Sequence, residues 1–349
     1  MSHKIQHIAV MRLSAMGDVA MTVPVLRALA HHYPDLKLTV ISRPFFQPFF
    51  KDIPNLHFFA FDAKERHKGI FGLWRLFQDL KAFKIDAFAD LHNVLRSKVV
   101  RILFALSGKK TAFVDKGRAD KKALTRAENK IFQPLTTMFE RHQLVFEILG
   151  FPIDLSRPQF PAKAKISQPE LATIVSQSNT LIGTAPFAQY DSKVYPLDLM
   201  QEVIDSLAQN QEHTILLFGG GQNEKEQLDN LKGDKNNVIN MAGKVPFATE
   251  LDLISNLDLM LSMDSGNGHI AAMLGVPVVT LWGATHPYAG FLPFNQMLDN
   301  ALVSDRNHYP NLPTSVYGNK KVAGYENAMR TILPEQVVAR ITGILKEKK

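Results

Sequence analysis

Four short blocks of this chain contain residues that could catalyse a reaction or bind a ligand. Each block follows an apolar segment of the length of a β-strand. In the first block, Gly17 permits a tight turn and Asp18 stands where a helix begins. A carboxylate there serves either as a helix cap or as a general base for a hydroxyl group. An unperturbed aspartate has a pKa near ~3.9, so the base role requires close geometry or a raised pKa. The block lacks GxGxxG, which argues against a dinucleotide-dependent dehydrogenase.

The second block combines small residues with an acid and a histidine. Gly266 and Gly268 frame a turn into a helix, with Asp264 and Ser265 before them and His269 just inside. Free amides at a helix N-terminus favour phosphate, so we interpret the block as a phosphate cradle that Asp264 braces. The alternatives are that Asp264 contacts a hydroxyl, or that the block is only a turn and cap.

The third block is a run of three glycines that includes Gly220, followed by Glu224. Such a loop permits close approach by a nucleotide, and Glu224 can accept hydrogen bonds from ribose hydroxyls. The equally acceptable alternative is a flexible loop with Glu224 in the first turn of a helix, where the dipole favours an acid.

The fourth block contains Lys193, just before Tyr195 and Pro196. A lysine in this setting is usually exposed. As a phosphate ligand, it would instead place its positive charge next to a phosphate leaving group.

Several kinds of chemistry are excluded. The chain has no cysteine, which rules out disulfides, thiolate metal sites and cysteine nucleophiles. It has no Asp-Xaa-Asp motif, no metal-ligand spacing and no GxSxG motif. We therefore expect neither a metal nor a cofactor.

The elements that must position these blocks alternate between strands and helices. Strands are expected at 8–13, 37–42, 57–61, 87–91, 180–184, 214–218, 238–241, 259–263 and 278–282, and helices at 19–31, 196–209, 224–231 and 249–256. This pattern predicts an α/β protein with parallel, doubly wound sheets, which bind ligands at the carboxyl ends of their strands.

A length of 349 residues suits two domains, and a proline-rich stretch at 150–168 suggests the boundary. We expect Rossmann-like domains at 1–160 and 170–330, facing an inter-domain cleft, and a C-terminal helix at 334–349. With 46% hydrophobic and 21% charged residues, we expect a globular chain without a membrane span or a signal peptide. The expected location is the cytoplasm.

The net charge of +7 is concentrated in one stretch. Residues 96–141 contain twelve basic and four acidic residues, and the rest of the chain is close to neutral. We expect this stretch to bind a phosphorylated acceptor, with Arg96 and Lys98 as acceptor-binding residues, or to contact an anionic membrane. A merely solvated surface is the alternative, and nucleic acid is disfavoured because no recognition motif accompanies the charge.

Taken together, the blocks resemble glycosyltransferase family 9, the lipopolysaccharide heptosyltransferases. The similar segments are 8–19, 90–97 and 264–285. The resemblance implies a GT-B fold and metal-independent, inverting transfer of a heptose from a nucleotide-sugar, ADP-heptose, to a phosphorylated, lipid-linked lipopolysaccharide core acceptor. It also implies peripheral contact with the inner face of the inner membrane.

The resemblance assigns roles to residues as well. It implies that Asp18 and Lys193 are catalytic, Asp18 as the base and Lys193 as a phosphate ligand. The implied donor-binding residues are Lys193, Gly220, Glu224, Asp264, Ser265, Gly266 and His269. Tyr195, Asn267 and His286 depart from the family pattern and leave the donor sugar open. The alternatives are a GT-B-fold sugar-nucleotide epimerase or hydrolase, or a non-catalytic sugar-binding protein.

Overall fold

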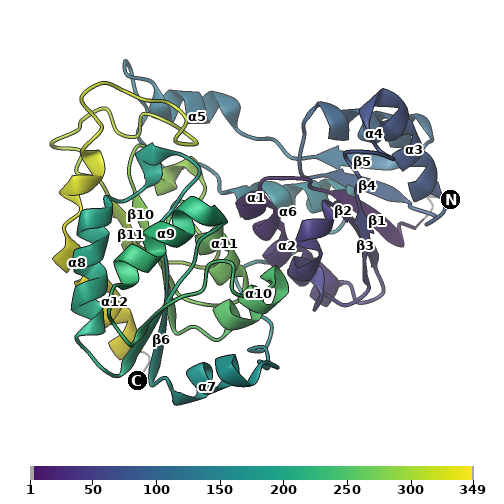
Figure 1. Cartoon of the computed structure of the whole chain (residues 1–349). Helices are drawn as coiled ribbons and strands as arrows, with labels where there is room; N and C mark the ends of the chain where they lie inside the picture. Colours follow the sequence, from purple (N-terminus) through teal and green to yellow (C-terminus); the bar gives the residue numbers. More distant parts are fainter. Residues whose placement is uncertain (1–3, 348–349) are drawn as a thin grey trace. The chain divides into compact units, whose positions relative to one another are not determined.

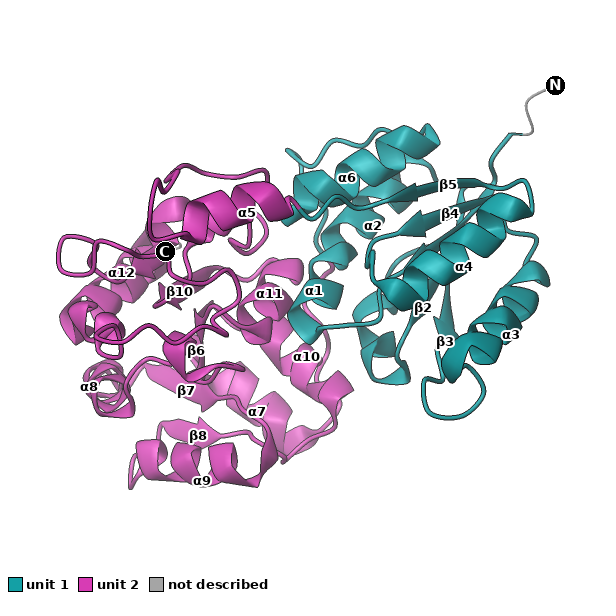
Figure 2. Ribbon diagram, turned by 90° about the horizontal axis from the view of Figure 1, so that it is seen from above, with its two compact units in different colours: residues 1–116, 138–160 teal, residues 117–137, 161–349 magenta. Residues whose placement is uncertain are grey.

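The computed structural model describes residues 4–347, which form two compact units (Figures 1 and 2). Unit 1 comprises residues 1–116 and 138–160, and unit 2 comprises residues 117–137 and 161–349. Within the described residues, no helix is both long enough and apolar enough to cross a bilayer.

Unit 1 is built on a five-stranded parallel sheet with the order β3-β2-β1-β4-β5. Its strands are β1 (His7–Met11), β2 (Lys37–Ser42), β3 (Leu56–Ala60), β4 (Ala87–Asp90) and β5 (Lys110–Phe113). The chain moves outward from β1 to β3 and then returns to add β4 on the other side of β1. The direction of winding therefore reverses between β1 and β4, which is where such sheets bind ligands.

Helices cover both faces of this sheet (Figure 2). They are α1 (Met16–Ala20), α2 (Thr22–His32), α3 (Gly69–Lys81), α4 (Leu95–Leu106) and α6 (Met138–Leu149). On one face, Leu76 of α3 and Phe104 of α4 pack in a buried cluster with Phe88 of β4. On the other face, α2 and α6 contact each other.

Unit 2 repeats the plan with a six-stranded parallel sheet in the order β11-β10-β9-β6-β7-β8. The strands are β6 (Thr180–Ala185), β7 (His213–Leu217), β8 (Val238–Asn240), β9 (Leu259–Met263), β10 (Val278–Trp282) and β11 (Ala301–Val303). Here the winding reverses between β6 and β9. The strands β9 and β10 are buried along their whole length and are mostly apolar, which is typical of parallel strands covered on both faces.

The helices of unit 2 are α5 (Arg118–Thr125), α7 (Pro169–Gln177), α8 (Leu197–Ala208), α9 (Gly221–Lys232), α10 (Phe247–Ser255), α11 (Gly266–Met273) and α12 (Pro334–Glu347). Val337 and Ile341 of α12 share the core with Ile204 of α8. The C-terminal helix is thus part of unit 2, and the last two residues of its expected range, 348–349, lie outside the described residues.

Residues 117–137 differ from the expected division, which placed them in the first domain. They group with unit 2 because their side chains find partners there. The ammonium group of Lys130 donates to the Pro313 carbonyl oxygen at 2.8 Å, and the Arg306 guanidinium lies 3.5 Å from the centre of the Phe132 ring. Burial, together with the charge of Arg306, lowers the pKa of Lys130 to about 8.

The basic stretch at 96–141 is consequently divided between the units. Five of its twelve basic residues belong to unit 2, and Lys121 and Lys130 among them are largely buried in structural contacts. A single basic surface on the first domain was expected from the sequence, and that expectation is wrong. Local charge counts do not reveal which unit a connecting segment packs against.

Candidate active site

In each unit, some of the expected site residues lie where the sheet reverses its winding. In unit 1, Asp18 follows β1, and the block that contains His92 follows the neighbouring strand β4. In unit 2, Lys193 follows β6, and Asp264 follows the neighbouring strand β9. Since the strands of each sheet are parallel, their carboxyl ends share one edge, and the loops that leave that edge lie close together.

In unit 1, Asp18 forms an ion pair with Arg12. The Arg12 Nη2 atom lies 2.6 Å from Asp18 Oδ2, and the same oxygen accepts a hydrogen bond from the Ala15 amide at 3.2 Å. Arg12 is buried and is held by the Ser14 and Leu91 carbonyl oxygens at 2.9 and 2.7 Å. Asp18 therefore makes the local contact expected of a helix cap. Its side chain is also 32% exposed, so it remains accessible to a ligand.

His92 is a second polar group beside this pair that sequence analysis did not select. Its ring is buried, and among the described residues its Nδ1 atom has no hydrogen-bond partner. Burial, reinforced by the charges of Arg12 and Lys116, lowers the pKa of His92 to about 3. The ring is therefore neutral at physiological pH and has an unused hydrogen-bonding atom. The only sequence signal was its place in the block that resembles the family.

The loop that carries His92 is held by the buried carboxylate of Asp90. Its Oδ1 atom accepts hydrogen bonds from the amides of His92 and Asn93 at 3.0 and 2.7 Å. On the other side, Arg101 approaches Asp90 Oδ2 at 3.5 Å and stacks over Phe113. The loop is thus anchored by a side chain at the end of β4 itself.

The expected acceptor-binding residues lie in the first turns of α4. Arg96 and Lys98 are both exposed there. Arg43 and Lys116 also act electrostatically on His92, as Arg12 does. Sequence analysis did not select Arg43 or Lys116 as site residues, because nothing in their local sequence separates them from ordinary surface cations.

In unit 2, Lys193 and Asp264 form a buried ion pair. The distance from Lys193 Nζ to Asp264 Oδ2 is 3.0 Å, and the side chains are only 13% and 9% exposed. Thr285 donates to the same carboxylate oxygen at 2.8 Å. Asp264 thus braces the lysine-bearing loop, and Lys193 is far less exposed than a lysine in such a sequence usually is.

A distant segment of the chain completes the surroundings of Lys193. Gly318 has a φ of +84°, and a Cβ atom there would overlap the aliphatic stem of Lys193. Its carbonyl oxygen accepts a hydrogen bond from Ser192 Oγ at 2.7 Å, and its amide donates to Ser315 Oγ at 2.9 Å. Ser315 and Thr314 in turn donate their amides to the Ala284 carbonyl oxygen. This contact could not be read from the sequence, because more than one hundred positions separate Lys193 from Gly318.

The N-terminus of α11 lies in the block that is expected to form a phosphate cradle. Ser265 is the N-cap residue, but its hydroxyl lies 3.1 Å from Ser262 Oγ and, within the described chain, caps no amide of the helix. The amides of the first turn, beginning at Gly266, are left without an intrahelical acceptor, as in any helix. His269 is 8% exposed, so little of its ring is accessible to a ligand.

Gly220 and Glu224 meet in the loop after β7. The Gly220 amide donates to Glu224 Oε2 at 2.7 Å, and a Cβ atom on Gly219 would lie only 3.1 Å from that oxygen. The glycines therefore allow the carboxylate to fold back over the loop. Since β7 pairs with β6, this loop leaves the sheet about one strand spacing, ~5 Å, from the strand that leads to Lys193.

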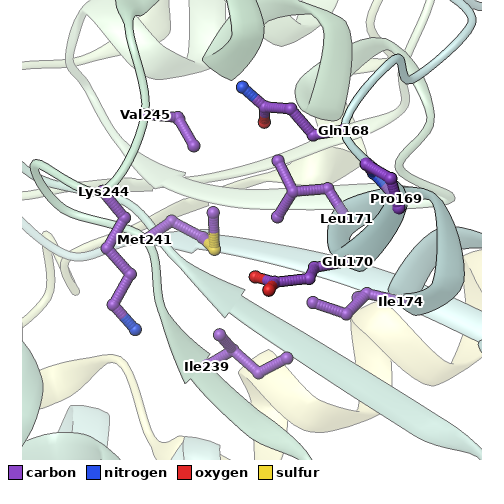
Figure 3. Close-up of a pocket in the computed structure, with 9 residues that line it drawn as sticks. All are labelled: Gln168, Pro169, Glu170, Leu171, Ile174, Ile239, Met241, Lys244 and Val245. Atoms are coloured by element: carbon purple, nitrogen blue, oxygen red, sulfur yellow. The ribbon is translucent and has the colours of Figure 1, made fainter.

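Unit 2 also contains a pocket of about 650 Å³ between α7 and the segment that follows β8 (Figure 3). Its lining residues are Gln168, Pro169, Glu170, Leu171, Ile174, Ile239, Met241, Lys244 and Val245. In Figure 3 the carboxylate of Glu170 points into a mostly apolar surround. The nine lining residues include no expected site residue, so the pocket and the Lys193–Asp264 pair are built from different side chains.

Among residues 4–347, no group of three or more histidine or acidic side chains is placed to hold a metal ion. The charged groups described above are instead arranged as cation–carboxylate pairs.

Comparison with known proteins relates most of the chain to heptosyltransferases. The family model described as Glycosyltransferase family 9 (heptosyltransferase) matches residues 73–321. The chain is 26% identical over 303 residues to the lipopolysaccharide core heptosyltransferase OpsX of Haemophilus influenzae, covering 84% of this chain and 83% of that protein.

Two solved structures have the same fold. A glycosyltransferase family 9 protein from Veillonella parvula superposes with a TM-score of 0.74 at 20% identity, covering 99% of each chain. Heptosyltransferase WaaC of E. coli, in a structure with ADP, gives a TM-score of 0.65 at 17% identity and covers 97% of this chain and 99% of its own.

Proposed function

This chain belongs to glycosyltransferase family 9 (heptosyltransferase), and on that premise we propose that it transfers a heptose from ADP-heptose to a lipopolysaccharide core acceptor. Its two parallel-sheet units have the GT-B fold, and it is a glycosyltransferase. The name of OpsX supports the sugar and the acceptor, and the ADP in the WaaC structure supports the nucleotide. The observation that carries the proposal is the buried Lys193–Asp264 pair at the switch point of unit 2.

The donor is bound by unit 2 in this proposal. Lys193 and the first amides of α11 offset the charge that develops on the departing diphosphate, without a metal ion. Asp264 orients Lys193, and the free oxygen of Glu224 accepts a hydrogen bond from the ribose. Lys193, Asp264 and Glu224 are held in place by contacts within the protein, so little rearrangement is needed when the bond breaks.

The acceptor is activated by unit 1. Asp18 removes the proton of an acceptor hydroxyl, whose oxygen attacks the anomeric carbon while the bond to the diphosphate breaks, inverting the configuration. Arg12 pairs with Asp18 and fixes the orientation of its carboxylate. Arg43, Lys116, Arg96 and Lys98 attract the phosphates of the acceptor.

A donor screen tests the proposal directly. Thermal unfolding is measured with ADP, UDP, GDP and CMP, and ADP should stabilise the protein most. A ligand at one hundred times its dissociation constant stabilises the native state by about 2.7 kcal/mol. A clear preference for another nucleotide would contradict the proposed donor.

An activity assay then separates transfer from other uses of the donor. Release of ADP from ADP-heptose should require the core acceptor and should survive a chelator. Donor consumption without acceptor would favour an epimerase or hydrolase, and loss of activity with the chelator would contradict metal-independent transfer.

A further inference from the structure

The outer surface of helices α3 and α4 exposes large apolar side chains. We call this surface the α3–α4 face and define it by Ile70, Phe71, Trp74, Leu95, Ile102 and Leu106. Phe71 and Leu106 are each 80% exposed, and Trp74 is 53% exposed. Single exposed apolar residues are ordinary, but contiguous patches mark interaction surfaces.

These exposed side chains do not take part in the hydrophobic core of unit 1. Leu73, Leu76 and Phe77 of α3 already fill the buried cluster against the sheet, and α4 contributes Val100 and Phe104. A surface helix usually has polar residues opposite its buried stripe. Both helices instead carry apolar residues on the solvent side too, at helical spacing along α4.

The two helices form one continuous surface. They contact each other along the same face of the sheet (Figure 2). Between them is an open groove of about 500 Å³ lined by Ile70, Phe71, Trp74, Val99 and Leu103, and its lining is almost entirely apolar. The residues that define the face therefore act as a patch and not as scattered positions.

The charged residues on and around this face are mostly basic. Residues 66–110 contain ten basic and three acidic residues. Exposed cations in the two helices or next to them in sequence include Lys68, Arg75, Lys81, Arg96 and Lys98.

The three acids do not offset these cations. Asp79, the single acid in the sequences of α3 and α4, is held by Arg66 at 2.6 and 2.8 Å. Asp86 accepts hydrogen bonds from the amides of Gln6 and His7, and Asp90 is buried. Within residues 66–110, the cations of the two helices are therefore not offset by an unpaired carboxylate, and the exposed Glu65 lies just before this stretch.

We propose that the α3–α4 face docks on an anionic phospholipid bilayer, with Phe71, Trp74 and Leu106 inserted and the surrounding lysines and arginines at the headgroups. Aromatic side chains favour the membrane interface, and basic residues beside an apolar face are attracted by anionic lipids. A second copy of the chain fits poorly, because a two-fold interface would bring the same cations against each other.

The inference goes beyond the proposed transfer reaction, since it requires neither the donor nor the acceptor. The experiment therefore uses the full chain with vesicles alone. Phosphatidylcholine vesicles with and without phosphatidylglycerol are sedimented with the protein, and we expect binding to those with phosphatidylglycerol and weaker binding at high salt.

The two tryptophans provide an internal reporter of orientation. Trp74 is half exposed on the face, whereas Trp282 is 1% exposed in the core of unit 2. Vesicles with phosphatidylglycerol should shift the tryptophan fluorescence emission to shorter wavelength, and brominated lipids should quench this fluorescence. Both effects should disappear in Trp74→Tyr and persist in Trp282→Phe.

A pair of matched variants tests the inserted side chains. Phe71→Ser combined with Leu106→Ser should lower the vesicle partition coefficient by about tenfold or more, since both residues lose apolar area that the bilayer would bury. The control is Leu144→Ser combined with Ile148→Ser, which changes two residues of α6, 49% and 58% exposed, on the other face of the same sheet. The control should bind as the parent does.

Three outcomes would overturn the inference. The first is that the parent protein does not bind the anionic vesicles. The second is equal loss of binding in both variant pairs while thermal unfolding shows both to be folded. The third is a dimer in solution that the Phe71 and Leu106 substitutions dissociate, which would identify the face as a contact between copies.

Discussion

Lys193 Nζ lies 3.0 Å from Asp264 Oδ2, although the two residues belong to loops that follow different strands. Unit 1 contains the same relationship in Arg12 and Asp18, whose closest atoms are 2.6 Å apart. In both pairs a largely buried cation forms an ion pair with a carboxylate at the point where the sheet reverses its winding. Removal of one partner of such a pair leaves the other charge buried and uncompensated, whereas removal of both is far less costly.

A double-mutant cycle on the first pair separates its structural and chemical roles. Lys193→Met and Asp264→Asn should each lower the free energy of unfolding, by about 3–5 kcal/mol for a fully buried pair. The double variant should recover much of that loss but should not recover transfer activity. Chemical unfolding and steady-state kinetics check the two parts. Recovery of activity in the double variant would show that Lys193 is not needed for the reaction.

Asp18→Asn should lower kcat by about 10²–10⁴-fold, because that is the usual contribution of a general base. Binding of ADP, measured by calorimetry, should be unchanged, since unit 1 does not bind the donor in this proposal. Asp234→Asn is the control, because Asp234 is an exposed acid outside the candidate site. If Asp18→Asn retained more than about a tenth of the activity, Asp18 would not be the base.

Gly318→Ala should weaken donor binding, because the new methyl group would overlap the stem of Lys193. Gly324→Ala is a matched control: its φ of +82° imposes the same backbone strain, but a Cβ atom there meets nothing within 4 Å. Both variants should lose some stability, and only Gly318→Ala should raise the dissociation constant for ADP. An equal change in both would mean that backbone strain alone is responsible.

The lowered pKa of His92, about 3 against 6.5 for an unperturbed histidine, predicts a pH dependence of stability. Between these values the unfolded chain binds a proton that the folded chain does not. The contribution of His92 to stability is therefore present above pH 6.5 and is lost as the pH falls, at up to about 1.4 kcal/mol per pH unit. His286, with a pKa of about 4, acts in the same direction. In His92→Asn the loss of stability below pH 6.5 should be smaller in urea unfolding; an unchanged pH profile would contradict the shift.

Glu250 should have the opposite effect, because burial raises the pKa of its carboxyl group to about 7. The folded state holds the proton more tightly than the unfolded state, so the stability from this group is lost as the pH rises from about 4.5 through 7. Glu250→Gln should thus increase the melting temperature most above pH 7. Glu226→Gln, at an exposed position of α9, is the control and should show no such trend.

The sequence alone did not predict β5, β11 or the helices α3, α4 and α6. It was sufficient for the other nine of the eleven described strands and for the position of the chemical blocks at strand ends. These features depend on local patterns. Buried parallel strands need continuous apolar segments, and the turns that follow them need small or capping residues. Asp18, Asp264 and Glu224 could be selected for this reason, as could the glycines beside them.

Tertiary structure decided which of these residues meet. The Lys193–Asp264 pair depends on β6 and β9 being neighbours, and the contact of Gly318 with Lys193 depends on the path of a segment far along the chain. The unpartnered nitrogen of His92 and the exposure of Phe71 are also properties of the folded surroundings. The physical reason is that periodicity indicates which residues are apolar or turn-forming, while partners are chosen by strand order and packing between residues distant in sequence.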